Sequence, residues 1–175
     1  MSVRACAVPP HTLLHRYQDG NGFADCYVTE LPGAVSQAQF IEAFNTSGFF
    51  KIERSLLTHL ASRPASDADA RQLAAGTARR FSAWTVEAQS DAELLLADFT
   101  GRTRSWLMAA AILQDGVVVR TRLQFGSAIV PRAGAAAGSR DLGWLFHALL
   151  GFHKLYSRAL LWAATRRLTK LAIHF

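Results

Sequence analysis

The sequence predicts an α+β domain in which a curved antiparallel β-sheet packs around a long C-terminal α-helix. Three observations lead to this prediction: an amphipathic stretch at residues 141–170, strand-like runs between residues 79 and 130, and short helix-like segments between residues 36 and 76. A sheet and a helix that each carry one apolar face bury those faces against each other. The chain has 175 residues, of which 50% are hydrophobic, and this is enough for one such core.

The stretch DLGWLFHALLGFHKLYSRALLWAATRRLTK, residues 141–170, repeats apolar side chains at the spacing of one helix face. Polar side chains such as Lys154 and Arg158 fall on the other side, as in an amphipathic helix. Gly151 is the position where we expect any bend, because glycine weakens a helix locally. The predicted buried stripe contains Leu142, Leu145, Phe146, Leu149, Phe152, Tyr156, Leu160 and Ala163.

The beginning of the chain is predicted to contain an arm and one strand. Residues 1–20 show no sustained periodicity, so we expect an irregular N-terminal arm, with residues 21–175 forming the single domain. The run FADCYVTEL, residues 23–31, is rich in β-branched and aromatic side chains and ends at a Pro-Gly turn. This composition is typical of a strand.

Two to three short helices are predicted after this strand. Ser36 is a predicted N-cap for the first of them, which stops before Gly48. Residues 49–63 carry an apolar stripe at helical spacing, which the following proline ends. Ser66 and Asp69 have the spacing of a capping box and predict a short third helix with a C-terminal glycine cap at Gly76.

Strand-like runs from residue 79 onward predict an antiparallel meander and, with the first strand, five strands in all. Asp115–Gly116 is the strongest hairpin signal, and a two-residue turn there places Gln114 opposite Val117. The residues that this register places together on the apolar face are Trp106, Met108, Ile112, Val119, Leu123 and Phe125. The glycine-rich stretch 131–140 is predicted to be a loop before the last helix.

This order of elements, with a sheet curled around the last helix, is that of a helix-grip fold. The segments FADCYVTELPG, FFKIERSLL, DFTGRTRSWL, FGSAIVP and LLGFHKLYSRALL resemble an uncharacterised bacterial domain family of the START-type (SRPBCC) helix-grip superfamily. The resemblance covers roughly residues 20–170. It implies a hydrophobic cavity between sheet and long helix, since the superfamily includes lipid carriers, polyketide cyclases and sensors of hydrophobic ligands. The usual superfamily pattern has seven strands, whereas this sequence predicts five.

Composition and motifs exclude several classes of function. The net charge of +6 is concentrated in residues 140–175, where we expect a solvated basic helix face and no nucleic-acid partner. No apolar run reaches the ~18–20 residues of a membrane span, and no secretory signal is visible, so we expect a cytoplasmic protein without a transmembrane segment. Cys6 and Cys26 are predicted to be free thiols. No metal-ligand, phosphate-loop or nucleophile-elbow pattern is present, so no metal or cofactor is expected.

Apolar side chains on the predicted sheet and last helix are the candidate ligand-binding residues. Aromatic and sulfur-containing side chains suit the wall of a ligand pocket, and they equally suit a filled core. The candidates are Trp106, Met108, Leu123, Phe125, Phe152 and Tyr156.

Two pairs are candidate catalytic groups: Asp98 with Arg104, and His153 with Tyr156. A two-residue turn after Phe99 places Asp98 opposite Thr103 on the wet side of the sheet. A three-residue loop instead places Asp98 opposite Arg104 inside the pocket, where the Asp98 pKa shifts. His153 and Tyr156 are neighbours on one helix face. Each of these residues also fits a purely structural role.

The leading hypothesis from the sequence is a small domain that binds an apolar or amphipathic small molecule between its sheet and C-terminal helix, without covalent chemistry. A cyclase or isomerase that uses acid–base groups in the same cavity is one alternative. A protein-interaction or membrane-surface module that uses the basic C-terminal helix is the other.

Overall fold

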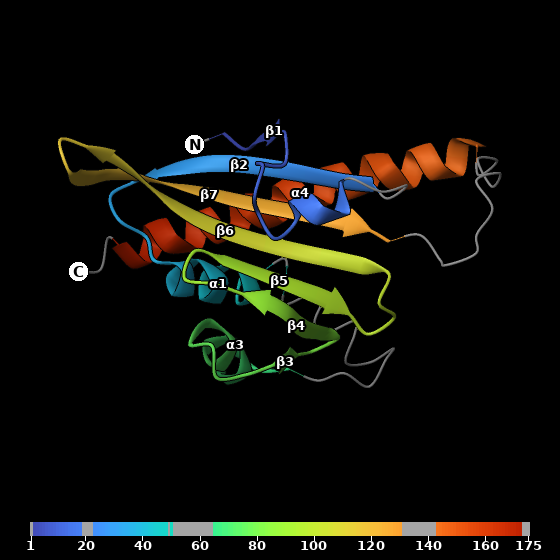
Figure 1. Ribbon diagram of the computed structural model, residues 1–175, viewed down its shortest axis with the longest axis horizontal. Coiled ribbons are helices and arrows are strands. Elements are labelled where there is room, and N and C mark those ends of the chain that lie inside the picture. The colour runs from blue at the N-terminus through green and yellow to red at the C-terminus, as the bar shows by residue number, and fades with distance from the viewer. Residues whose placement is uncertain (1, 19–22, 49, 51–64, 131–142, 173–175) are drawn as a thin grey trace.

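The computed structural model describes residues 2–18, 23–48, 50, 65–130 and 143–172, and the side chains of residues 143–152 and 172 lie outside this description. The described residues form an α+β fold with one seven-stranded antiparallel sheet (Figure 1). The long C-terminal helix runs lengthwise along one face of the sheet, behind the strands in this view. The α+β class and the C-terminal helix predicted from the sequence are therefore confirmed.

The sheet has the strand order β1-β2-β7-β6-β5-β4-β3, so the last strand in sequence lies in its interior, between β2 and β6. The strands are β1 Arg4–Cys6, β2 Phe23–Pro32, β3 Arg80–Phe81, β4 Trp84–Gln89, β5 Glu93–Asp98, β6 Thr103–Gln114 and β7 Val117–Ile129. The prediction of five strands is wrong in two places. Part of the predicted irregular arm is the edge strand β1, and the first run of the meander divides at Ser82, whose φ of 53° breaks the strand.

The helices begin where the predicted caps lie. In α1, Gln37–Asn45, Ser36 and Gln39 form a capping box. In α3, Asp67–Ala74, Ser66 and Asp69 do the same, and Gly76 with φ of 73° follows the helix end. The C-terminal helix α4, Gly143–Ala172, is continuous through the predicted bend position. The predicted helix at residues 49–63 and the predicted loop at residues 131–140 lie outside the described residues, apart from Phe50.

Apolar side chains are buried on both faces of the sheet, and this was not predicted. The main core lies between the sheet and the helices, where Phe44 packs against Phe125 with ring centroids 4.8 Å apart. A second core lies on the opposite face, beneath the N-terminal arm. Its buried members are Val8, Leu14, Cys26, Leu95, Trp106 and Ala128. The arm that was predicted to be irregular therefore covers part of the sheet face opposite the helices.

The predicted register of the β6–β7 hairpin is correct at its turn and wrong further along. Gln114 pairs with Val117 as expected, but a β-bulge between Ile112 and Leu113 shifts the pairing by one residue. Beyond the bulge Leu107 pairs with Phe125 and Ala109 with Leu123, while Trp106 and Met108 point to the other face. A shift of one residue moves every side chain of a strand to the opposite face, and this explains the error.

Candidate functional site

The six predicted ligand-binding residues do not meet in one cavity. Leu123 and Phe125 are buried in the main core, and Tyr156 packs against that core from α4. Trp106 is fully buried in the second core, and Met108 packs against it. The side chain of the sixth residue, Phe152, lies outside the described part of the chain. The bulge in β6 is the physical reason for the separation, because it moves Trp106 and Met108 to the far face.

Ala97 pairs with Arg104, and in this register Asp98 faces Thr103, as in the first of the two predicted alternatives. Its carboxylate is used by the turn itself: Oδ1 accepts hydrogen bonds from the backbone N–H groups of Arg102, at 2.8 Å, and Thr103, at 2.9 Å. Burial raises the Asp98 pKa, but the hydrogen bonds from Thr100 and from the backbone outweigh burial and hold the pKa below its ordinary value. Asp98 is therefore a turn-stabilising residue in this structure.

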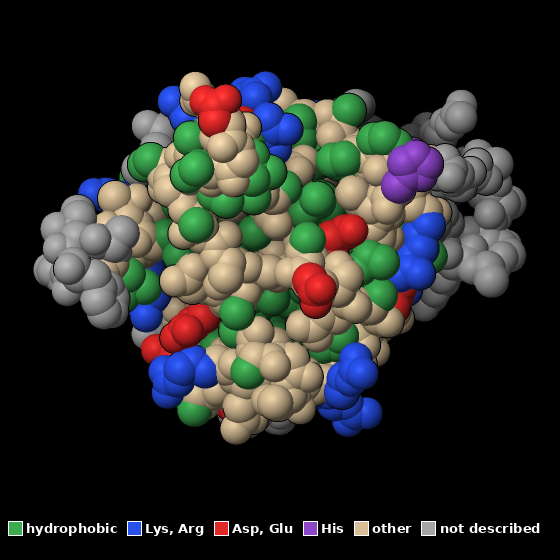
Figure 2. Space-filling model, turned by 60° about the vertical axis from the view of Figure 1, so that its left-hand side comes forward, with side chains coloured by type: hydrophobic (Ala, Val, Ile, Leu, Met, Phe, Trp, Pro, Cys, Tyr) green, Lys and Arg blue, Asp and Glu red, His purple; other side chains and the backbone are tan. Residues whose placement is uncertain are grey.

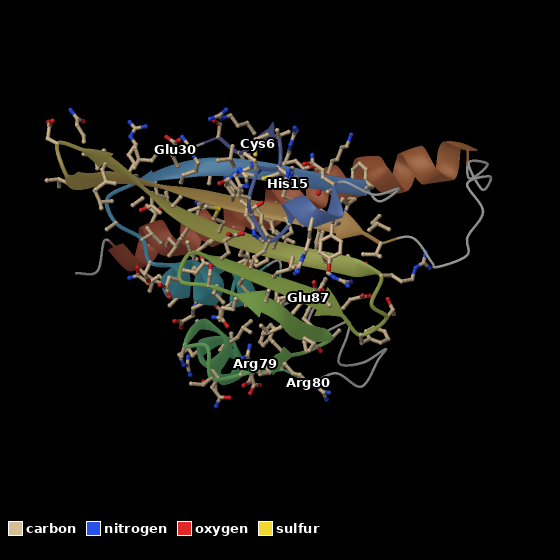
Figure 3. All side chains as sticks on the ribbon, in the orientation of Figure 1. Cys6, His15, Glu30, Arg79, Arg80 and Glu87 are labelled. Carbon is tan, nitrogen blue, oxygen red and sulfur yellow. The ribbon has the colours of Figure 1, made fainter. Side chains whose placement is uncertain are left out.

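The predicted partner of Asp98, Arg104, is engaged elsewhere. Its Nε lies 2.5 Å from Glu87 Oε2 and donates to the hydroxyl of Tyr17 at 3.0 Å. The guanidinium also lies over the Tyr17 ring. Glu87, marked in Figure 3, belongs to β4, so these contacts fasten the N-terminal arm to the outer face of the sheet. The predicted Asp98–Arg104 pair is not formed.

His153 joins a polar cluster that the sequence analysis missed. Its Nε2 lies 2.7 Å from Ser127 Oγ and 3.5 Å from Asp25 Oδ2, beneath α4 on the helix side of the sheet. Ser127 Oγ donates to Asp25 Oδ1 at 2.6 Å, and the Tyr27 hydroxyl donates to Asp25 Oδ2 at 3.1 Å. We call Asp25, Tyr27, Ser127 and His153 the β2–β7 polar cluster.

No local signal marks this cluster in the sequence, because it depends on the pairing of the distant strands β2 and β7. Asp25 and Ser127 are direct partners in that pairing, although they are far apart in the chain. Burial raises the Asp25 pKa, but the hydrogen bonds from His153 and Ser127 outweigh it and lower the pKa below its ordinary value. Asp25 is thus an anion that three neighbouring side chains stabilise.

The geometry of the cluster differs from that of a nucleophilic triad. In a triad the histidine bridges the serine and the carboxylate through its two different ring nitrogens. Here Ser127 and Asp25 both face the same nitrogen, Nε2 of His153, and the Ser127 hydroxyl gives its proton directly to Asp25. The histidine therefore does not activate the serine, and the cluster is a partly buried hydrogen-bond network around the Asp25 carboxylate.

Replacing Asp25 with asparagine is expected to lower the free energy of unfolding by about 1–3 kcal/mol at pH 7, because the charged hydrogen-bond acceptor is lost. The pKa of Asp25 is lower in the folded than in the unfolded chain, so its contribution is present above the unfolded pKa of about 4 and is lost as the pH falls through the folded value. Urea titrations of both proteins at pH 7 and pH 3 test this: the difference should shrink at pH 3. The exposed Asp91→Asn variant is the control, and a pH-independent Asp25 effect would contradict the role given to the anion.

A small apolar groove opens where the end of β2, the start of α1 and the end of α4 meet, at the left-hand end of Figure 1. Its volume is about 250 Å³. Leu31 and Val35 form one wall, and Leu168 and Leu171 of α4 form another. Figure 2 brings this end of the molecule forward and shows hydrophobic side chains exposed among polar ones, with Lys and Arg side chains toward the margins.

Arg167 lines this groove, and its Nε is buried without a hydrogen-bond partner among the described residues. The same residue lines a neighbouring hollow of about 280 Å³, together with Trp162, Arg166 and Lys170. Arg167 lies seven residues after Leu160, so the helical period places it on the predicted buried stripe. A charged residue on an apolar stripe is the sequence signal that could have identified this site.

The described residues contain no group of three or more His, Cys, Asp or Glu side chains that could hold a metal ion. Within the same residues, no helix has the length and apolar character needed to cross a bilayer.

Fold and sites together define an α+β protein with an aromatic core and a small amphipathic groove. Comparison of the chain with protein-family models, curated proteins and solved structures gives no match. The resemblance to the START-type superfamily stays a prediction from the sequence motifs.

Proposed function

We propose that this chain is a helix-grip domain of the START type that binds a small amphipathic carboxylate, without covalent chemistry, in the groove between β2, α1 and α4. The resemblance of the sequence segments to that superfamily supports the fold assignment, as does a sheet that carries a long C-terminal helix on one face. The groove replaces the pocket that the sequence predicted deeper in the sheet. The proposed function, binding of a small amphipathic molecule, is the one predicted from the sequence, but the binding residues differ from the predicted ones.

The buried Nε of Arg167 is the observation that carries the proposal. A buried N–H without an acceptor costs free energy, and most such groups in proteins have a partner. A carboxylate is the acceptor that a guanidinium binds best, through two parallel hydrogen bonds. Because the groove beside Arg167 is lined by aliphatic side chains, the ligand that fits both features has an acidic head and an apolar tail.

The charges around the groove favour one orientation of this ligand. Arg167 lines the groove from α4, whereas Glu42 lines it from α1. An acid is attracted to the α4 wall and repelled from the α1 wall. The groove is slightly smaller than the ~300 Å³ that marks the lower end of typical ligand pockets, so the occupant is small, such as a medium-chain fatty acid or an aryl carboxylate.

Octanoate is expected to bind the wild-type protein saturably and to raise its melting temperature, since a ligand that prefers the native state stabilises it. Octanol, which has the tail without the charge, should bind at least about tenfold more weakly. Arg167→Gln should reduce octanoate binding to the octanol level. Isothermal titration calorimetry and thermal melts measure both effects.

Two variants make the experiment specific. Arg166→Gln is the matched control, because Arg166 is exposed, lies over the Trp162 ring and does not line the groove. It should leave octanoate binding nearly unchanged. Ala34→Trp adds a large side chain at an exposed position of the groove wall and should block both octanoate and octanol. Equal octanoate affinity in the Arg167 and Arg166 variants would show that the acid does not bind at Arg167.

A second candidate function is binding to an anionic membrane surface through the outer face of α4. Leu155 is 68% exposed and Trp162 41%, and the cations Arg158 and Arg166 lie beside them on the same face of the helix. An apolar stripe beside cations is typical of interfacial helices. The two candidates differ in the octanoate experiment: the groove saturates with monomeric octanoate, whereas a surface site binds only anionic vesicles.

A further inference from the structure

The two cysteines, predicted from the sequence to be free thiols, lie side by side in the structure. Cys6 on β1 and Cys26 on β2 are direct partners in the pairing of these strands. Their sulfur atoms are 3.1 Å apart, and neither is in a disulfide. Cys6 is marked in Figure 3, near the upper edge of the sheet. Only the pairing of the N-terminal arm with β2 brings the two together.

The backbone at this pair already has the spacing that a disulfide needs. Directly opposed residues in antiparallel strands have Cα atoms about 4.5–5.5 Å apart. Disulfides span Cα separations of about 4.4–6.8 Å. The strands therefore need no rearrangement for the two sulfur atoms to bond.

The two thiols differ in access and in charge state. Cys26 is 1% exposed, whereas Cys6 is half-buried at the edge of the sheet. The amide Nε2 of Gln124 lies 3.8 Å from the Cys26 sulfur and 4.0 Å from the Cys6 sulfur. The hydrogen bond between the two sulfur atoms lowers the pKa of Cys6 to about 7. Burial raises this pKa, while Gln124, Arg4 and Arg122 lower it further. The hydrogen bond to Cys6 and burial raise the pKa of Cys26.

We propose that Cys6 and Cys26 form a redox-active dithiol, in which Cys6 is the residue that peroxide oxidises and Cys26 is the resolving residue that closes a disulfide between β1 and β2. The assignment of roles follows from access, since peroxide reaches the half-buried Cys6 and not the enclosed Cys26. A reactive thiol beside a resolving thiol is the arrangement of known redox sensors in general.

The chemistry proceeds in two steps with hydrogen peroxide as the oxidant. The Cys6 thiolate attacks one peroxide oxygen, the O–O bond breaks, and the sulfur is oxidised to a sulfenic acid while hydroxide leaves and takes up a proton as water. The Cys26 sulfur then attacks the Cys6 sulfur, the S–S bond forms and the S–O bond breaks. The Cys26 proton leaves with the hydroxyl group as a second water. In total two thiols and one peroxide give one disulfide and two waters.

Disulfide formation has a structural consequence for the second core. The chain between Cys6 and Cys26 carries Leu14 and Tyr17, which pack over Trp106 and the outer face of the sheet. A covalent link between the two ends of this segment limits the freedom of the unfolded chain and holds the edge strand β1 in place. Oxidation is therefore expected to stabilise the arm.

The test treats the reduced full-length protein with hydrogen peroxide and follows it by intact-mass spectrometry and thermal melts. The wild type should lose two hydrogen atoms without dimerising, its melting temperature should rise, and dithiothreitol should reverse both changes. Cys26→Ser should stop at a Cys6 sulfenic acid that dimedone traps. Cys6→Ser should stay unmodified over the same time, because the remaining thiol is buried.

Several outcomes would overturn the proposal. The proposal is contradicted if the wild type fails to react with peroxide, if Cys6 is oxidised to the sulfinic acid without forming a disulfide, or if the disulfide links two molecules. A Cys6→Ser variant that reacts as fast as Cys26→Ser would reverse the assignment of roles and would equally contradict it. Circular dichroism of both serine variants confirms that they are folded before the comparison.

Discussion

Replacing Trp106 with alanine is expected to lower the free energy of unfolding by about 3–5 kcal/mol, the usual cost of deleting a buried tryptophan. Trp106 is fully buried at the centre of the second core. Its Nε1 donates to Glu93 Oε2 at 2.7 Å, and the same oxygen accepts the backbone N–H of Leu13 at 2.8 Å. The substitution removes the side chain that packs beneath the arm and one of the two donors that hold Glu93.

The residue opposite Trp106 has no side chain that could fill the cavity left by the substitution. The pairing partner of Trp106 is Gly126, and a Cβ at that position would lie 3.2 Å from the indole, 2.8 Å from the Asp25 carbonyl oxygen and 2.4 Å from Leu14. The ring therefore occupies the space that a side chain at residue 126 would need. This close fit leaves little room for the structure to relax after the ring is removed.

Trp106→Phe is the matched variant, because it keeps an aromatic ring and loses the N–H donor. We expect it to cost about 1–3 kcal/mol, most of it from the lost hydrogen bond to Glu93. Urea titrations followed by circular dichroism measure both variants. A Trp106→Ala effect below about 1 kcal/mol would show that the arm and its core contribute little to the stability of the fold.

Replacing Leu160 with alanine is expected to cost about 2–5 kcal/mol, because it deletes a leucine from the main core. Leu160 is 3% exposed on the face of α4 that packs toward the sheet. Lys154 is exposed on the same helix, and Lys154→Ala should change the free energy of unfolding by no more than about 0.5 kcal/mol. Leu149 belongs to the same predicted stripe, but its side chain lies outside the described residues.

The comparison of Leu160→Ala with Lys154→Ala tests which face of α4 is buried. Both substitutions end in alanine within one helix, so helix propensity changes little and packing dominates the difference. Urea midpoints at equal protein concentration measure it. If the two variants unfold at the same urea concentration, α4 does not pack on the sheet through this face.

Local chemistry in the sequence determined where most elements begin and end. The capping boxes at Ser36 and Ser66 each satisfy backbone N–H groups within a few residues, so they act wherever the helix lies. The Asp115–Gly116 turn needs positive φ at both residues, and the values are 51° and 78°. Asp and Gly adopt positive φ readily, so the residue types alone predict this turn. The helical period likewise predicted α4, but it did not predict the buried face correctly. Among the described side chains of α4 the buried ones are Ser157, Leu160, Leu161, Ala164, Thr165 and Leu168, and of these only Leu160 belongs to the predicted stripe.

The tertiary structure alone decided the faces, the partners and the candidate sites. A single bulge between Ile112 and Leu113 reversed which strand residues share a face, and no local propensity requires a bulge there. The β2–β7 polar cluster, the paired cysteines and the groove at Arg167 each join segments that are distant in the chain. The physical reason is the range of the interactions: caps and turns are satisfied by neighbours in sequence, whereas strand registers, buried polar clusters and grooves depend on which strands and helices meet.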